Sequence, residues 1–262
     1  MGLLEGKRAL VMGVGNKRSI AWGIATAFQR EGAELAFSYA IERLRENVVE
    51  LVGTLPNAAS VPVLPCDVAK QEEIDALFAR IAERWGRLDI LVHSIGYAPV
   101  EELKGRFVEI TRAGLASTID VSAYSLVALA RAALPLLEKS GGGSVISLTY
   151  NAVERVVPSY NAMAMAKAVL EAETRYLAAD LGPSNVRVNC ISAGPLKTLA
   201  ASAVRGISQA RDLMEAKAPL RRNVTQEEVG NVAVFLASEL SRCVTGATVF
   251  ADNGFNILGV TE

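Results

Sequence analysis

The chain has few of the side chains on which metal sites, disulfide frameworks and nucleic-acid surfaces depend. Its 262 residues include three cysteines and one histidine, and Lys plus Arg number 27 against 28 acidic residues. Cys66, Cys190 and Cys243 are odd in number and far apart, so neither a disulfide framework nor a zinc site is expected. All three are predicted to be small buried residues in a reducing compartment. Because the charges are balanced and form no block of one sign, nucleic acid is not expected as a partner.

The chain also lacks a long apolar run at its N-terminus and a linker rich in Pro, Gly or Ser. Its N-terminal apolar run, Ala9–Met12, is too short for a signal peptide or a membrane span, so the protein is expected to be cytoplasmic and not bound to a membrane. Residues 1–262 are expected to form one domain. With 51% hydrophobic but only 6% aromatic residues, the core should consist mainly of Ala, Val, Leu and Ile, which suits parallel strands covered by helices on both faces.

Short β-rich runs alternate with stretches of helical period along the whole chain. Strands are expected at Arg8–Met12, Glu34–Ser38, Ser60–Cys66, Leu88–His93, Ser144–Leu148, Val186–Ile191 and Thr248–Ala251. Helices are expected at Ser19–Arg30, Glu42–Leu55, Gln71–Trp85, Thr111–Glu138, Ser159–Leu181 and Gln226–Leu240, the last with a capping box of Thr225 and Glu228. The alternation predicts an α/β fold, a doubly wound Rossmann-like domain with a seven-stranded parallel sheet. Residues 195–222 interrupt it after the sixth strand and are expected to form a substrate lid.

The first strand runs into a glycine-containing turn that is typical of dinucleotide binding. Gly13 and Gly15 follow the strand, and the next helix opens at about Ser19. Glycines let the backbone approach a pyrophosphate, and the helix N-terminus offers unpaired N–H groups. The pattern is not G-x-G-x-x-G, and such turns also carry glycine for structural reasons, so the motif alone leaves both interpretations open.

Further candidate cofactor contacts follow the third and fourth strands. Asp67 could accept a hydrogen bond from the adenine amino group or cap the next helix, and Ile95 with Gly96 could form a wall beside the adenosine or a close-packed turn. His93, the single histidine, ends an apolar strand and is expected to be structural. Neither an acidic nor a basic residue stands at the very end of the second strand, which favours NADH and leaves NADPH open.

Tyr160 and Lys167 lie seven residues apart in a segment predicted to be helical. At about 100° per residue this spacing puts both side chains on one helix face, with roughly 10 Å of rise between their Cα atoms. A lysine near a phenol stabilises negative charge, and the phenol can donate to an oxygen that becomes enolate-like. Without further context the pair also fits an exposed helix face that has no chemistry.

Together these motifs resemble the short-chain dehydrogenase/reductase family and, within it, the bacterial NADH-dependent enoyl-(acyl carrier protein) reductases, over nearly the whole chain. The resemblance rests on four stretches: Gly13-x5-Ser19-Ile20-Ala-x-Gly23, Val92-His-Ser-Ile-Gly96, Tyr160-x6-Lys167, and residues 191–202. In the commonest branch of the family the motif is Tyr-x-x-x-Lys, but Met163 stands at that tyrosine position here. The longer spacing is the signature of the enoyl reductases.

The resemblance implies a role for individual residues. Tyr160 would bond the thioester carbonyl and stabilise the enolate, Lys167 would hold the nicotinamide ribose, and Tyr150 would stand near the substrate as a second tyrosine. The cofactor positions would be Gly13, Ser19, Ile20, Asp67, Val68, Ile95, Lys167, Leu196 and Thr198, the acyl pocket would be lined by Ala98 and Met163, and no metal is implied. The implied reaction is reduction of a trans-2-enoyl thioester by NADH in fatty acid biosynthesis.

The resemblance also implies partners. Acyl carrier protein would carry the substrate, and a homotetramer would form through the two long helices, Thr111–Glu138 and Ser159–Leu181. Two features depart from the family pattern. Ala40 stands where a polar ribose contact is common, and Arg205 with Arg211 makes only a sparse basic patch on the lid.

Two other functions fit parts of the pattern. A carbonyl reductase of the same family would use Ser147, thirteen residues before Tyr160, although Met163 argues against it. A nucleotide-sensing or scaffold protein would keep the fold without the chemistry, but it has no use for Tyr160 and Lys167 together. Turnover of a 3-ketoacyl thioester would indicate the carbonyl reductase, and NADH binding without oxidation would indicate the scaffold.

Overall fold

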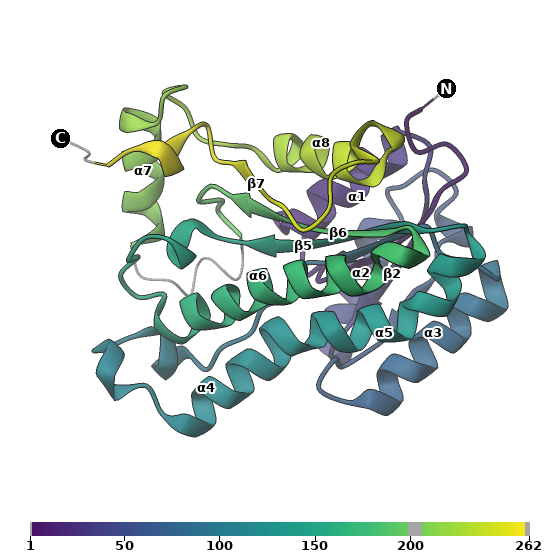
Figure 1. Cartoon of the computed structure of the whole chain (residues 1–262), viewed down its shortest axis with the longest axis horizontal. Coiled ribbons are helices and arrows are strands. Elements are labelled where there is room, and N and C mark those ends of the chain that lie inside the picture. The colour runs from purple at the N-terminus through teal and green to yellow at the C-terminus, as the bar shows by residue number, and fades with distance from the viewer. Residues whose placement is uncertain (1, 199–205, 260–262) are drawn as a thin grey trace.

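The computed structural model describes residues 2–198 and 206–259, which form a layered α/β fold (Figure 1). The strands are β1 (Arg8–Met12), β2 (Glu34–Tyr39), β3 (Val63–Pro65), β4 (Ile90–His93), β5 (Gly143–Thr149), β6 (Val186–Ala193) and β7 (Thr248–Ala251). Within the described residues these seven strands form one parallel sheet in the order β3-β2-β1-β4-β5-β6-β7. The predicted fold class is confirmed. Because the strand order reverses between β1 and β4, their carboxyl ends flank the crevice where doubly wound sheets bind ligands.

Helices cover both faces of the sheet (Figure 1). On one face lie α1 (Ile20–Arg30), α2 (Glu42–Val52) and α8 (Gln226–Ala237), and on the other lie α3 (Gln71–Trp85), α5 (Ser125–Lys139) and α6 (Asn161–Leu181). Helix α4 (Arg112–Ile119) leads into α5, and α7 (Ile207–Lys217) follows β6. Short 3-10 turns occupy Ala58–Ser60, Val100–Leu103, Phe107–Glu109, Asn151–Val153, Gly182–Ser184, Glu239–Ser241 and Phe255–Ile257. The core is therefore two apolar layers, one on each face.

Several observed elements differ from the predicted ones where the backbone is irregular. Strand β3 is shorter than expected because Ala58–Ser60 forms a 3-10 turn before it. The expected single helix Thr111–Glu138 is broken by a π-helical turn, Asp120–Tyr124, between α4 and α5. Helix α7 is not predicted from the sequence, because its Ala, Ser and charged residues form no clear apolar stripe.

Two local predictions have opposite outcomes. The capping box is confirmed, since Thr225 accepts a hydrogen bond from the Glu228 amide and the Glu228 carboxylate accepts one from the Thr225 amide. Cys66 and Cys190 are buried as expected, but the prediction for Cys243 was wrong, because this residue is exposed in the loop between α8 and β7.

The helical run Arg112–Lys139 is long and apolar enough, by length and composition, to cross a membrane. In this fold 50% of its most apolar stretch is buried inside the protein. Helices α4 and α5 pack on α6, and α5 also packs on α3, β4 and β5. These contacts make the run part of the helix layer that covers one face of the sheet.

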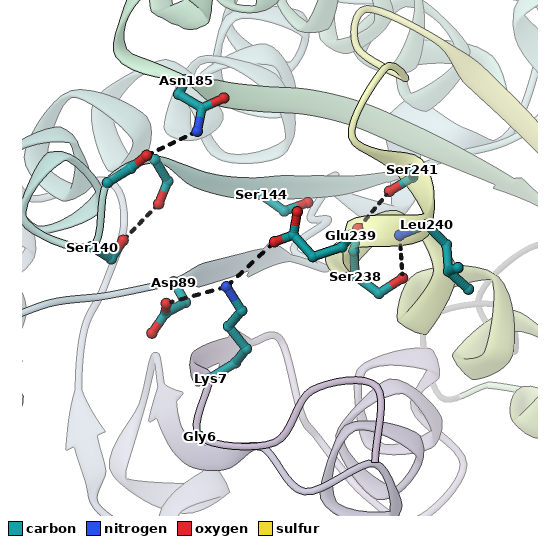
Figure 2. Close-up of polar contacts among 12 residues, drawn as sticks. Gly6, Lys7, Asp89, Ser140, Ser144, Asn185, Ser238, Glu239, Leu240 and Ser241 are labelled. Atoms are coloured by element: carbon teal, nitrogen blue, oxygen red, sulfur yellow. Dashed lines mark hydrogen bonds and ion pairs between the residues drawn. The ribbon is translucent and has the colours of Figure 1, made fainter. Parts of the chain in front are cut away.

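A polar network holds the amino-terminal edge of the sheet (Figure 2). The Asp89 carboxylate is only 6% exposed, accepts a 3.0 Å hydrogen bond from the Arg8 amide, and lies 3.5 Å from Arg87 Nε. Lys7 Nζ stands 3.8 Å from Asp89 and 3.7 Å from Glu239, as Figure 2 shows. This pairing compensates a buried charge and ties β1, β4 and the turn after α8 together. It lies at the edge opposite the carboxyl ends of the strands.

Candidate active site

Gly13 stands where β1 ends, at the carboxyl edge of the sheet. Its φ is 93°, and a Cβ there would lie 2.0 Å from the Ser94 carbonyl oxygen, just after β4. The left-handed backbone and the close approach of the neighbouring chain both exclude a side chain. The glycine thus lets the turn after β1 pack directly on the backbone that follows β4 at the switch point of the sheet, where the pyrophosphate is predicted to bind.

Ser19 is the N-cap of α1 but does not cap the helix with its side chain. Its hydroxyl instead accepts hydrogen bonds from the Gly15 and Asn16 amides, both at 3.0 Å, and so closes the turn that Gly13 begins. Because Ser19 is directed to the loop, the first turn of α1, beginning at Ile20, is not covered by this side chain. That arrangement is compatible with an anion at the helix N-terminus.

The expected adenosine contacts lie after β3 and β4. The Asp67 carboxylate accepts a 3.1 Å hydrogen bond from the Ala69 amide and stands 3.6 Å from Lys70 Nζ. Lys70 is the N-cap of α3, so the alternative that Asp67 caps this helix was wrong. Val68 is buried and Ile95 half-buried in the apolar layer beneath α3 and α5. Their contacts with adenosine stay a prediction.

The structure brings Tyr150, Tyr160 and Lys167 together where β5 ends and α6 begins. The rings of the two tyrosines meet edge to face, with centroids 5.2 Å apart and planes at 62°. Lys167 is only 7% exposed, and its Nζ donates a 2.8 Å hydrogen bond to the Leu148 carbonyl. Leu148 lies on β5, and Tyr150 follows directly after the end of that strand, so the ammonium lies beside the chain that carries Tyr150.

Tyr160 does not lie within α6, and its predicted place on a helix face was wrong. The helix begins at Asn161, Tyr160 is its N-cap with φ −119° and ψ 5°, and Ser159 has a left-handed φ of 62°. The seven-residue helical spacing therefore does not describe how the two side chains are placed. The bent entry to α6 sets the Tyr160 ring against Tyr150, whereas Lys167 reaches the Leu148 carbonyl.

Burial changes the pKa of each member of this group. Desolvation, with a smaller contribution from Tyr150, raises the pKa of Tyr160 well above its usual value, and desolvation also raises the pKa of Tyr150. Both phenols therefore stay protonated and can donate hydrogen bonds at neutral pH. Desolvation lowers the pKa of Lys167 to about 8, although Cys190 and Glu171 act in the opposite direction. At neutral pH this lysine is still mainly cationic.

Glu171 belongs to the surroundings of this group, although sequence reasoning did not identify it. It lies one helical turn beyond Lys167 and accepts a 2.7 Å hydrogen bond from Thr149 Oγ1 at the end of β5. Burial raises the pKa of the Glu171 carboxyl. Its four-residue spacing from Lys167 is the signal that could have pointed to it.

His93 is fully buried at the end of β4, and its Nε2 lies 2.7 Å from Ser125 Oγ. Burial, with a contribution from nearby Lys167, lowers its pKa to about 3, so the imidazole is neutral. Its burial fits the predicted structural role, which stays a prediction, and Nδ1 has no hydrogen-bond partner among the described residues. Over the same part of the chain, no group of three His, Cys, Asp or Glu residues could hold a metal ion.

A small apolar cluster adjoins Tyr160. Its buried members are Leu103, Met163 and Ala166, and the residues packed against them are Ala98, Ile119 and Tyr160. The two predicted acyl-pocket residues, Ala98 and Met163, therefore lie together beside the phenol. Leu103 joins them from the turn Val100–Leu103, and nothing in its local sequence indicates this position.

Ser147, which the carbonyl reductase alternative needs, lies inside the fold. It is 0% exposed, and its hydroxyl lies 3.4 Å from Thr174 Oγ1, two helical turns beyond Lys167 on α6. A serine that acts on a carbonyl must reach the substrate beside the tyrosine. The geometry of Ser147 does not allow that role.

The chain after β6 begins the predicted lid. Leu196 is half-buried against the apolar layer of α1 and α8, and its carbonyl accepts a 2.8 Å hydrogen bond from the Thr198 amide. On α7, Met214 is only 1% exposed and packs tightly on Gly194, where a Cβ would lie 2.7 Å from the Met214 methyl carbon. Arg211 is on α7, whereas Arg205 lies outside the described residues.

Comparison with known proteins places this fold and site in a family. A family model described as enoyl-(acyl carrier protein) reductase matches residues 13–256. An NADH-dependent enoyl-(acyl carrier protein) reductase of Aquifex aeolicus is 48% identical over 260 residues, which cover 99% of this chain and 95% of that protein. The Escherichia coli enzyme of the same name is 47% identical over 263 residues, covering 100% and 98%.

Solved structures agree with these sequence relationships. The Bacillus cereus enoyl-acyl carrier protein reductase, in complex with NADP+ and indole naphthyridinone, matches with a TM-score of 0.96 and 48% identity, covering 99% of this chain and 100% of that one. The Anaplasma phagocytophilum enzyme in complex with NAD matches with a TM-score of 0.94 and 40% identity, covering 100% and 98%. The chain belongs to the enoyl-(acyl carrier protein) reductase family.

Proposed function

We propose that this protein reduces trans-2-enoyl thioesters carried on acyl carrier protein, with NADH as the hydride donor, in fatty acid biosynthesis. The observation that carries the proposal is the pair of protonated tyrosines, Tyr150 and Tyr160, beside the buried Lys167 at the carboxyl edge of the sheet. Membership of the family and the NADH-dependent names of the relatives support the same reaction and cofactor.

The residues at the switch point fit a dinucleotide. Gly13 lets the turn after β1 pack closely on the chain after β4, and Ser19 shapes the same turn. Lys167 uses one ammonium proton on Leu148 and has two further donors for ribose hydroxyls. Bound NADH supplies the hydride for the β-carbon of the substrate. The exposed Ala40 offers no charge to select between ribose forms, so NADPH is tested beside NADH.

Tyr160 supplies the main contact to the reacting thioester. Its phenol stays protonated and can donate to the carbonyl oxygen, on which negative charge grows as the enolate forms. The positive charge of Lys167 stabilises that charge, and the edge of Tyr150 limits the orientations of the Tyr160 ring. Ala98, Met163 and Leu103 provide an apolar wall for the acyl chain next to the phenol.

The remaining parts of the proposal concern the lid and the assembly. Residues 195–222 serve as a lid within a single catalytic domain, 1–262. The close packing of Met214 on Gly194 supports a fixed position for α7 relative to the end of β6. Tyr124 and Tyr176 are 45% and 81% exposed on the long helices, which supports a homotetramer formed through these helices. The assembly acts in the cytoplasm.

The test follows the loss of NADH absorbance with crotonyl-CoA or a longer trans-2-enoyl thioester, beside NADPH and a 3-ketoacyl thioester. Tyr160→Phe is expected to lower the rate on the order of 10²–10³-fold with little change in NADH binding, because only the oxyanion contact is removed. Wild-type protein assayed in parallel is the reference.

Other outcomes of this test would indicate a different function or a different role for Tyr160. Turnover of the 3-ketoacyl substrate alone would indicate a carbonyl reductase, and NADH binding without oxidation would indicate a scaffold. If Tyr160→Phe keeps the wild-type rate, the assignment of Tyr160 is wrong.

A further inference from the structure

The π-helical turn Asp120–Tyr124 lies against the segment that follows β4. Taken together with His93, the last residue of β4, this segment is residues 93–98, and it contains both Ile95 and Ala98, which are proposed to face the cofactor and the acyl chain. Turns of the π type are rare within helices and occur often at functional sites. The described contacts of this turn show what it holds.

Ser122, within the π turn, forms hydrogen bonds with both the backbone N–H and the backbone C=O of Tyr97. Its hydroxyl accepts a hydrogen bond from the Tyr97 amide and donates one to the Tyr97 carbonyl, each at 2.8 Å, and the serine is 0% exposed. The Tyr97 side chain is 53% exposed, so the part that is held is the backbone. One buried hydroxyl therefore fixes the position of a loop residue that no strand pairing holds.

Ser125, three residues further along, holds the other end of the segment. Its hydroxyl donates to the Val121 carbonyl at 2.7 Å, so its oxygen accepts from Nε2 of the neutral His93 at 2.7 Å. Both residues are buried. The segment is thus attached to the same stretch of helix at its first residue and again at its fifth.

The residues near these two attachments reach the proposed binding surfaces. Ile95 packs in the apolar layer under α3 and α5, and Ala98 packs in the cluster that includes Tyr160. Between them, a Cβ on Gly96 would lie 3.9 Å from the Met163 methyl carbon. Ile119, the residue before the π turn, packs in the cluster as well. The turn thus contributes to the pocket and holds the chain that forms its wall.

We propose that Ser122 and Ser125 are positioning residues, which clamp residues 93–98 so that the wall of the active site keeps its place relative to Tyr160. The inference rests on the proposed function. Ser122 acts on the acyl side, through Tyr97 and Ala98, and Ser125 acts on the cofactor side, through His93 and Ile95.

The test separates substrate binding from cofactor binding. Ser122→Ala is expected to raise KM for the enoyl thioester on the order of tenfold, with NADH affinity nearly unchanged, because it releases two hydrogen bonds next to Ala98. Ser125→Ala is expected to weaken NADH binding, measured by direct titration, more than it raises KM. The matched control is Thr118→Val, which removes a fully buried hydroxyl whose hydrogen bond to Gly114 stays within α4.

A second measurement does not depend on turnover. Hydrogen exchange should show the Tyr97 amide protected in the wild-type protein, and segment 93–98 should exchange faster in Ser122→Ala but not in Thr118→Val. If Ser122→Ala fails to fold, Ser122→Cys and the wild-type exchange pattern decide the question.

The clamp is refuted if the wild-type Tyr97 amide is unprotected, or if Ser122→Ala matches Thr118→Val in KM, NADH affinity and exchange. A wild-type protein that reduces no enoyl thioester would instead refute the proposed function. The exchange comparison and the NADH titration would still test whether the two serines hold the segment.

Discussion

Replacing Lys167 by methionine is expected to stabilise the free protein at neutral pH while it removes the activity. Burial lowers the pKa of this lysine from 10.5 to about 8. At about 1.4 kcal/mol per unit, the fold disfavours the protonated side chain by roughly 3 kcal/mol. Methionine has a similar volume and no charge to bury. The Leu148 carbonyl loses its donor, which costs about 1–3 kcal/mol, so a net gain of about 1 kcal/mol is expected at about pH 7.

The sign of the pH dependence follows from the direction of the shift. Between about pH 8 and pH 10.5 the folded wild-type protein binds fewer protons at Lys167 than the unfolded chain does, so its stability rises with pH across this window. The penalty is fully present below the window and is relieved within it. The stability of Lys167→Met lacks this dependence on pH. The stability advantage of Lys167→Met over the wild type should therefore shrink and then reverse as the pH rises.

Urea unfolding of both proteins at about pH 7 and about pH 10, at one protein concentration, measures the difference. Lys139→Met, which changes an exposed lysine at the end of α5, is the control for loss of one positive charge. NADH should stabilise the wild type but not Lys167→Met, because the ribose donors are gone. A stability difference between wild type and Lys167→Met that stays constant with pH would refute the reasoning.

Two further substitutions test the turn at Gly13 and the buried carboxyl group of Glu173. Gly13→Ala should lose NADH affinity at least tenfold and unfold at a lower urea concentration, because its Cβ would meet the Ser94 carbonyl. The control is Gly6→Ala, which is also at positive φ but in open space and should keep its NADH affinity. Equal NADH affinity in the two variants would contradict this prediction. Burial raises the pKa of Glu173 to about 7, so the wild type loses stability as the pH rises from about 4.5 to 7. Glu173→Gln should therefore melt higher than wild type at about pH 8 and equally at about pH 4, and a difference that is the same at both values would contradict the shift.

Much of the fold could be predicted from the sequence because its signals are local. A parallel strand buried on both faces must be apolar throughout, and an amphipathic helix must follow it, so the alternation along the chain reports the layers directly. The ends of β1, β7 and α3 agree with the expected ones. Gly13 could be identified for the same reason, since the junction of the first strand and helix is a place where a side chain has no room.

The site could be predicted only in part. The spacing of Tyr160 and Lys167, together with the family resemblance, selected two residues whose catalytic roles stay a prediction, but the helical geometry assigned to them was wrong because Ser159 and Tyr160 lie before the first turn of α6. Spacing also left Ser147 as a possible catalytic residue, and only its burial against Thr174 decides otherwise.

The sequence by itself thus determined the layered fold, because its strand and helix signals follow from neighbours along the chain, and it predicted a cofactor turn and a tyrosine–lysine pair from motifs. The tertiary structure alone decided which hydroxyls are buried, that Leu103 joins the wall beside Tyr160, that Glu171 meets Thr149, and that the π turn holds Tyr97. These features join segments far apart in the chain. Their existence depends on how helices and strands pack, which no local spacing encodes.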